Sequence, residues 1–269
     1  GHGHSKHKKK GGKGKAKSGR SSGFRPILDE FTTLEQAQAA LREAGLESSN
    51  LVVGIDFTKS NTWTGTKTFG GRSLHDTSVW NPYQSVLSIM GKTLSEFDDD
   101  NFIPAFGFGD SFTRDRNCFP FYPDRVCHGI DEVLRRYNEI TPSITLAGPT
   151  NFAPVIRETI NIVRRERGYH ILIIIADGQV TAQKDTSDAI VEASSHPISI
   201  VCVGVGDGPW DVMEEFDDNL PTRQFDNFQF VDYNKVIREH REYPEPAFAL
   251  AALMEIPQQF KEIRRLGLM

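Results

Sequence analysis

Short runs of apolar residues, separated by stretches with helical periodicity, constrain the fold of this chain more than any other feature. The runs are rich in Val, Ile and Phe, contain or end in Gly or Asp, and cover residues 51–57, 102–108, 170–177 and 198–206. Parallel strands that are buried on both faces of a sheet have this composition. We therefore predict a strand at each of the four runs.

The segments between these runs have the pattern of helices that lie against a sheet. An early helix over 34–44 follows Thr32 and Thr33 at capping-box spacing and ends at Gly45. The other predicted helices cover 82–97, 129–140, 153–167 and 185–195, and a last strand and helix cover 227–231 and 248–265. This alternation predicts an α/β fold with a doubly wound, mostly parallel sheet and helices on both faces.

The composition is that of a globular chain. With 269 residues, of which 38% are hydrophobic and 25% charged, the chain can bury a sizeable core, and it is not collagenous, coiled-coil or wholly disordered. The longest apolar stretch is far shorter than the roughly 18 residues that a membrane span needs. The chain has three cysteines, Cys118, Cys127 and Cys202. They are too few for a disulfide framework, which favours a reducing, intracellular compartment.

The net charge of −5 is unevenly distributed. Residues 1–23 contain seven Lys, one Arg and no acidic residue, a charge of +8 that leaves −13 for the remaining chain. This segment also has no Leu, Ile, Val or aromatic residue, so it cannot bury enough apolar surface to offset the entropy of ordering. We predict a disordered basic N-terminal arm over 1–23 and one globular domain over 24–269.

Polar residues follow the predicted strands where a doubly wound sheet binds its ligands. Asp56, Thr58 and Ser60 place a carboxylate and two hydroxyls at alternate positions after one strand, and Asp177 ends another. Thr150 stands just before a predicted helix. Two carboxylates and three hydroxyls are hard oxygen ligands, which suit Mg²⁺ or Mn²⁺. The alternative is that these residues only cap strands and helices.

The motifs in which these residues stand resemble a known family. D-x-T-x-S at 56–60, G-P-T at 148–150 and A-D-G at 176–178 resemble the metal-ion-dependent adhesion site of von Willebrand factor A domains. GIDFTKSN, GFGD, GPTNFAPVI and VGVGDG resemble the copine branch of these domains. LESSNLVVGIDFTKSNTWTG, IIADGQVT and FDNFQFV are most similar to the A domains of plant RING domain ubiquitin ligases, and the resemblance covers about 31–260.

The resemblance implies how a metal ion is held and used. Ser60, Thr58 and Thr150 would bind the ion, and Asp56 and Asp177 would contact it directly or through water. Mg²⁺ or Mn²⁺ is expected in preference to Ca²⁺. Most A domains have Ser where this chain has Thr58, which keeps the hydroxyl. The open coordination position would accept an exposed Asp or Glu of a protein partner, so we expect a protein-interaction module without a small-molecule substrate.

The chain departs from the ubiquitin ligases in one respect. It contains no C-x-x-C pair, so we expect it not to transfer ubiquitin through a RING of its own, and no catalytic residue is assigned. The alternative function is the substrate-binding component of a ubiquitin ligase whose RING lies on a missing extension or on another chain. A phosphatase using Asp56 as nucleophile would need a second Asp where Thr58 stands.

The basic arm suggests association with a membrane. Gly1 opens a G-x-x-x-S sequence that fits N-myristoylation, and a single acyl chain needs a second, basic signal to hold a protein at anionic lipid. That signal would come from Lys6, Lys8, Lys9, Lys10, Lys13, Lys15, Lys17 and Arg20. We expect a protein of the cytoplasm and the cytoplasmic face of the plasma membrane, with the nucleus also open. A solvated tail or an expression remnant is the alternative.

Other motifs have simpler explanations. The acidic charge of the remaining chain argues against nucleic-acid binding. The glycines of 204–208 have G-x-G-x-G spacing, which indicates a tight turn and not a dinucleotide site. Asp110 is expected at the rim of the metal site or as a capping residue, and Lys59 is expected to face solvent.

Overall fold

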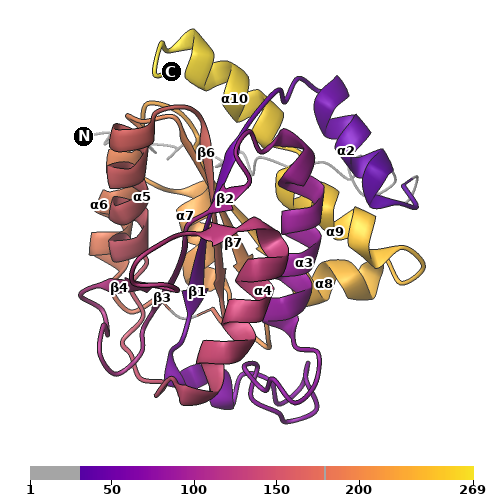
Figure 1. Cartoon of the computed structure of the whole chain (residues 1–269), viewed down its shortest axis with the longest axis vertical. Coiled ribbons are helices and arrows are strands. Elements are labelled where there is room, and N and C mark those ends of the chain that lie inside the picture. Colours follow the sequence, from indigo (N-terminus) through magenta and orange to yellow (C-terminus); the bar gives the residue numbers. More distant parts are fainter. Residues whose placement is uncertain (1–30, 179) are drawn as a thin grey trace, which may run out of the picture.

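The order of the strands places a switch point at the centre of the main sheet. The computed structural model describes residues 31–178 and 180–269, and its six-stranded sheet has the order β4-β3-β1-β6-β7-β8. The parallel strands are β1 (Asn50–Asp56), β3 (Ala105–Phe108), β6 (His170–Ala176), β7 (Ile198–Gly204) and β8 (Phe228–Asp232), and β4 (Cys118–Pro120) is an antiparallel edge. The chain leaves β1 in one direction for β3 and returns on its other side as β6 (Figure 1).

Helices cover both faces of this sheet (Figure 1). One face carries α2 (Leu34–Glu43), α3 (Pro82–Leu94), α4 (Gly129–Ile140), α8 (Tyr233–Glu239), α9 (Pro244–Leu253) and α10 (Ile256–Arg265). The other face carries α5 (Ala153–Glu166), α6 (Gln183–Ala193) and α7 (Asp211–Asp218). Short 3₁₀ turns lie at η1 (Lys59–Thr62), η2 (Ser95–Phe97) and η3 (Thr141–Ser143).

The central strands are buried on both sides, which explains their continuous apolar sequence. All seven residues of β6 are buried, and they alternate between two cores: Ile173 packs with the α3 side and Ile174 with the α5 side. β1 and β7 alternate in the same way. The predicted α/β class, with a mostly parallel sheet and helices on both faces, is confirmed.

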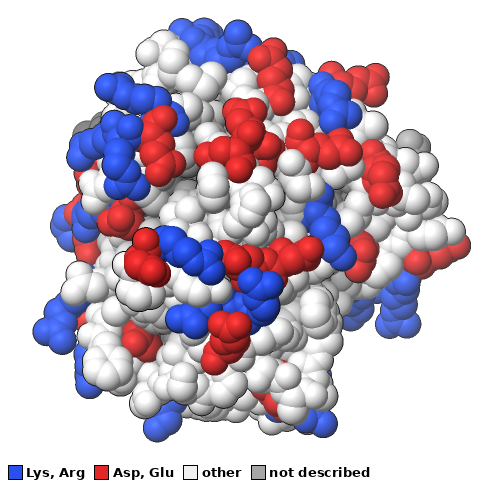
Figure 2. Space-filling model, in the orientation of Figure 1, with Lys and Arg blue, Asp and Glu red and all other residues white. Residues whose placement is uncertain are grey.

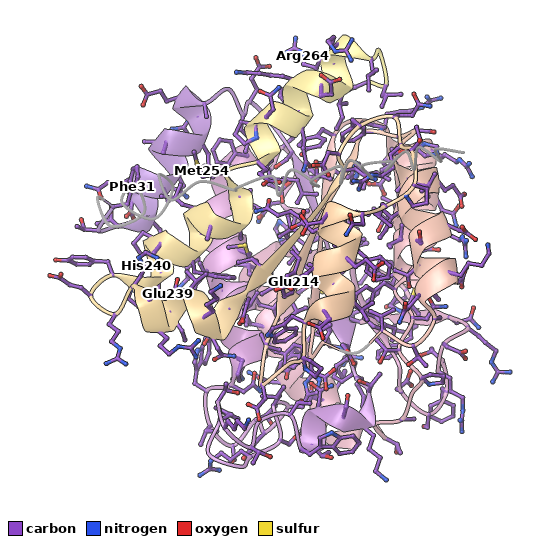
Figure 3. All side chains as sticks on the ribbon, turned by 180° about the vertical axis from the view of Figure 1, so that it is seen from behind. Phe31, Glu214, Glu239, His240, Met254 and Arg264 are labelled. Carbon is purple, nitrogen blue, oxygen red and sulfur yellow. The ribbon has the colours of Figure 1, made fainter. Side chains whose placement is uncertain are left out.

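Two predicted elements are divided in the structure. The run 102–108 forms β2 (Phe102–Ile103), which pairs with β5 (Cys127–His128) in a separate small sheet, and β3 in the main sheet. Pro104 stands between them, and a proline has no N–H to donate to a continuous ladder. The predicted helix 248–265 is likewise two helices, α9 and α10, which meet near Met254 (Figure 3). Pro257 at the start of α10 cannot donate a hydrogen bond to α9.

Some short elements of the structure were not predicted. α7, α8, β4 and β5 are short, so their sequences hold too few residues for a periodicity. Within the described residues, none of the helices has the length and hydropathy that crossing a bilayer requires. The predicted arm, with Gly1 and its eight basic residues, lies outside the described part of the chain.

Candidate metal site

The two predicted carboxylates lie next to each other at the switch point of the sheet. Asp56 is the last residue of β1, and Asp177 directly follows β6. The two strands are parallel neighbours, with Ile55 opposite Ile175, so both side chains emerge at the same edge. This is the position at which doubly wound sheets bind ligands.

Hydroxyl groups connect the two carboxylates. Thr58 Oγ1 donates to Asp56 Oδ1 at 2.6 Å and lies 3.1 Å from Ser60 Oγ. Ser60 Oγ in turn donates to Asp177 Oδ2 at 2.5 Å, and Thr64 Oγ1 donates to the same oxygen at 3.0 Å. The structure therefore brings together four of the five predicted residues and adds Thr64, which the sequence analysis did not single out.

Thr150 lies beside this group on a neighbouring turn. Ala147 pairs with Thr58, and its carbonyl accepts a hydrogen bond from Lys59 N at 2.8 Å, which fixes the turn against the β1 loop. The Thr150 carbonyl accepts from Thr181 N at 3.0 Å, which ties the same turn to the segment after Asp177. Thr150 is buried, but within the described residues its hydroxyl forms no hydrogen bond to the other four.

Both carboxylates are buried and each has an unsatisfied oxygen. Asp56 and Asp177 are 0% exposed, and among the described residues neither Asp56 Oδ2 nor Asp177 Oδ1 has a hydrogen-bond donor. Burial raises the pKa of Asp56 well above its usual range, and the neighbouring charge of Asp177 raises it further. Burial also raises the pKa of Asp177. Buried, unpaired acceptor oxygens are what a divalent cation satisfies, so the residues fit Mg²⁺ or Mn²⁺.

A layer of buried polar side chains lies beneath the β1 loop. His75 is held between the rings of Phe57 and Tyr83, with centroids 4.7 Å and 4.0 Å away, and its Nε2 lies 2.6 Å from the Asp56 carbonyl oxygen. Tyr83 donates to Asn61 Oδ1 at 2.6 Å, and Asn61 Nδ2 donates to the Thr58 carbonyl at 2.9 Å. Sequence reasoning missed these supporting residues, although Asn61 closes the GIDFTKSN segment.

The structure also shows the positions of Asp110, Lys59 and the 204–208 segment, for which the sequence pattern predicted simpler explanations. Asp110 is buried and accepts from Phe112 N and Thr113 N, as a capping residue does. Lys59 is exposed, as predicted. The carboxylate of Asp207 accepts from Lys67 N, Thr68 N and Thr68 Oγ1, which holds the glycine-rich 204–208 segment as a turn against another loop.

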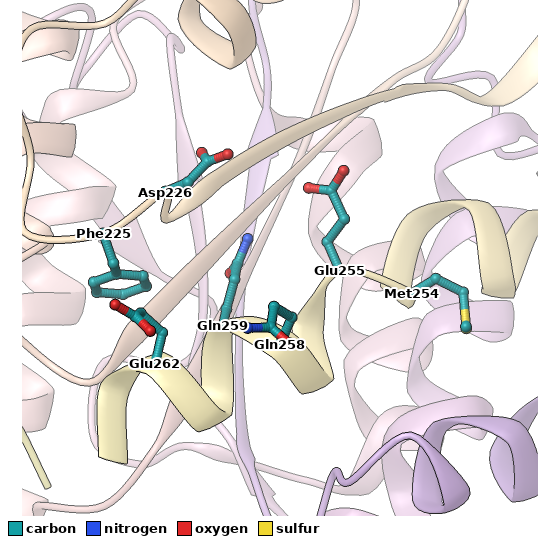
Figure 4. A pocket seen from close by; sticks show the side chains of 7 residues that line it. All are labelled: Phe225, Asp226, Met254, Glu255, Gln258, Gln259 and Glu262. Atoms are coloured by element: carbon teal, nitrogen blue, oxygen red, sulfur yellow. The ribbon is translucent and has the colours of Figure 1, made fainter. Parts of the chain in front are cut away.

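A separate pocket lies at the other end of the sheet. It has a volume of about 450 Å³ and lies between α10 and the segment preceding β8 (Figure 4). Its lining residues are Phe225, Asp226, Met254, Glu255, Gln258, Gln259 and Glu262, none of which belongs to the predicted site. Within the described residues, no group of three or more His, Cys, Asp or Glu is placed to hold a metal ion, and the three cysteines are free thiols.

Comparison with known proteins gives one family. A copine family model matches residues 73–269. The chain is 52% identical over 263 residues to the E3 ubiquitin-protein ligase RGLG1 of Arabidopsis thaliana, which is 91% of this chain and 54% of that protein. It thus spans about half the length of this ligase. It is 51% identical over 248 residues to Copine family protein 2 of Caenorhabditis elegans, covering 90% of this chain and 3% of that protein.

Among solved structures, the fold is similar to that of the manganese-loaded Plasmodium vivax TRAP protein. The TM-score is 0.47 with 12% sequence identity, and the match covers 72% of each chain.

Proposed function

This chain belongs to the copine family, and on that premise we propose that it is a metal-dependent protein-interaction module. Asp56, Thr58, Ser60, Thr150 and Asp177 would hold Mg²⁺ or Mn²⁺. The bound ion supplies a Lewis-acidic position to which an Asp or Glu of a partner protein coordinates. The residues of this chain would fix the ion at the edge of the sheet.

One observation supports this proposal above the others. Asp56 Oδ2 and Asp177 Oδ1 are buried side by side at a switch point without a donor from the described residues. A site that served only to cap strands would satisfy these oxygens, because a buried unpaired acceptor costs roughly 1–3 kcal/mol. A divalent cation would satisfy both and would neutralise the repulsion between the two carboxylates.

Titration calorimetry of the purified chain with Mn²⁺ and with Mg²⁺ tests metal binding. Asp56→Ala and Thr150→Ala should abolish or strongly weaken it while leaving the circular dichroism spectrum unchanged. Glu96→Ala is a matched control, because this exposed acid pairs with Arg42 at the opposite end of the sheet. Binding by Asp56→Ala that equals the wild type would contradict the proposed ligand set.

The docking role is tested by partner capture. The immobilised chain should retain proteins from a lysate in Mg²⁺ and release them in EDTA, and Thr150→Ala should retain none. Equal capture in Mg²⁺ and in EDTA would show that the interaction does not pass through the metal.

A second function is favoured by the similarity to RGLG1. That protein is a ubiquitin ligase, and this chain matches 54% of it, so the chain would be the substrate-binding part of such a ligase. The RING would lie on an extension or on another chain. Sequencing the transcript beyond the codon for Met269 tests the first arrangement. A reading frame that encodes regularly spaced Cys and His pairs would support it, and an immediate stop codon would exclude it.

We also propose reversible membrane association through the basic arm. The support is sequence alone: Gly1 in an acylation pattern and eight basic residues within 1–23. Metabolic labelling with a myristate analogue, compared between the wild type and Gly1→Ala in full-length protein with its initiator Met, tests it. An unlabelled wild type would refute acylation.

A further inference from the structure

Large aromatic side chains, Phe112 and Trp63 among them, are exposed on loops at the metal-site end of the described part of the molecule. Phe112, in the loop between β3 and β4, is 91% exposed, and Trp63, directly after η1, is 58% exposed. An aromatic ring in water gains none of the free energy that its burial would provide. We call Phe112 and Trp63 the aromatic rim.

The connectivity places Phe112 beside the β1 loop. β3 runs parallel to β1 with Phe108 opposite Asp56, so the loops that follow the two strands leave the same edge of the sheet. Gly109 lies directly against Thr58. Ser111 N donates to the Thr145 carbonyl at 2.9 Å, which fixes the Phe112 loop to the segment leading to Thr150.

Trp63 borders the other side of the same loop. Its backbone N–H donates to the Ser60 carbonyl at 3.0 Å. The next residue, Thr64, donates its hydroxyl to Asp177 Oδ2 and accepts at its carbonyl from Asp207 N, on the β6 and β7 side. The backbone of both rim residues is therefore held next to loops that carry candidate metal ligands.

The charges on these loops favour an acidic ligand. Lys59, Arg114 and Arg116 are exposed, and none of them forms an ion pair with another described residue. On the face shown in Figure 2, acidic and basic side chains crowd the upper and middle parts, whereas the lower end, where β1 terminates in Figure 1, is mostly uncharged. A surface with exposed cations and aromatic rings complements a segment that is both acidic and apolar.

We propose that the aromatic rim sets the specificity of docking: the partner presents a linear segment whose metal-binding Asp or Glu is flanked by a large apolar side chain. That apolar side chain packs against Phe112 and Trp63, and Lys59, Arg114 and Arg116 attract further acidic residues. The inference rests on the proposed metal-dependent docking and adds the chemistry of the partner to it. Aromatic residues are the side chains that most often carry binding energy at interfaces.

Selection from a displayed peptide library tests the proposal. Short peptides with a fixed central Glu and random flanks are selected on the immobilised chain, once in Mn²⁺ and once in EDTA. We expect Phe, Trp, Leu and Ile to be enriched next to the Glu in Mn²⁺ only. A synthetic peptide of the enriched sequence is then titrated against variants of the aromatic rim.

Phe112→Ser and Trp63→Ser should each bind this peptide about tenfold more weakly, while Phe112→Trp should bind as the wild type does. Phe102→Ser is the matched control, because Phe102 is 48% exposed in β2, at the opposite end of the sheet. All variants should bind Mn²⁺ alone within about twofold of the wild type, which also establishes that they are folded.

The outcomes separate the two proposals. Peptides selected in Mn²⁺ without apolar flanks, or unchanged binding by Phe112→Ser, would overturn the role of the aromatic rim and leave metal-dependent docking intact. A chain that does not bind Mn²⁺, or a library with no Mn²⁺-dependent enrichment, would overturn both.

Discussion

His75 Nε2 lies 2.6 Å from the backbone carbonyl oxygen of Asp56. Since a carbonyl can only accept, Nε2 carries the proton, and Nδ1 accepts from the Tyr137 hydroxyl 2.6 Å away. Tyr137 lies on α4, so this chain of hydrogen bonds connects a helix on one face of the sheet to the backbone of Asp56 at the edge of the sheet. Burial lowers the pKa of His75 to about 3 and so keeps the ring neutral. In the neutral ring, Nε2 remains the donor to Asp56 and Nδ1 remains the acceptor from Tyr137.

His75→Phe should destabilise the protein by about 2 kcal/mol. The new ring keeps the stacking between Phe57 and Tyr83, but the Tyr137 hydroxyl loses its acceptor. The Asp56 carbonyl loses its 2.6 Å hydrogen bond and retains a 3.4 Å contact from Asn61. Urea unfolding measures the loss. Tyr137→Phe removes the other partner, so the double variant should lose less than the sum of the single losses. Full additivity would mean that the two side chains do not interact.

The cost of His75→Phe should shrink as the pH falls. Below the ordinary pKa of 6.5, the unfolded chain takes up a proton at His75 that the folded protein does not take up until about pH 3. The wild type therefore loses about 1.4 kcal/mol per pH unit in this range through His75, and the variant does not. Urea unfolding of both proteins at pH 7, 6 and 5 tests this. A constant difference would show that His75 has the same pKa in both states.

Asp177→Asn should stabilise the metal-free protein by about 1–2 kcal/mol. The amide oxygen can still accept from Ser60 and Thr64, and the variant removes one of two buried, mutually repelling carboxylates. Thermal unfolding should show a melting temperature above that of the wild type in EDTA. Added Mg²⁺ should raise the melting temperature of the wild type only. A variant that melts lower in EDTA would mean that the charge of Asp177 is satisfied without metal.

The sequence predicted those parts of the fold and the site whose burial produces a recognisable run of apolar residues. β6 is predicted by its apolar run because both of its faces are buried, and Asp177 is predicted by its place at the end of that run. Thr64 and His75 carry no such signal, because they reach the site from a loop without periodicity. Pro104 divides the predicted strand 102–108 into β2 and β3. The residues on both sides of this proline are apolar, so the sequence pattern predicted one continuous strand.

Metal binding should release protons. Burial raises the pKa values of Asp56 and Asp177, and the charge of Asp177 raises that of Asp56 further, so a cation competes with protons for the site. Affinity for Mn²⁺ should therefore fall as the pH is lowered. Calorimetry at one pH in Pipes and in Tris, which differ in ionisation enthalpy, should give different heats. Identical heats in the two buffers would mean that both carboxyls are already ionised.

The methyl group that distinguishes Thr58 from Ser rests against Gly109. Gly109 has φ +81°, and a Cβ placed on it would lie 2.4 Å from Thr58 Cγ2, so no larger residue fits without moving Thr58. Gly109→Ala should therefore weaken Mn²⁺ binding at least about tenfold, because it displaces a hydroxyl that bonds to Asp56.

Thr58→Ser separates this contact from backbone strain. The substitution keeps the hydroxyl and removes the methyl, so Thr58→Ser alone should bind Mn²⁺ as the wild type does. Combined with Gly109→Ala, it should restore most of the lost Mn²⁺ affinity, while the strain at φ +81° still lowers the free energy of unfolding by about 1 kcal/mol. Calorimetry of the four proteins, with urea unfolding of each, completes the cycle. A double variant that binds no better than Gly109→Ala would show that strain alone distorts the site.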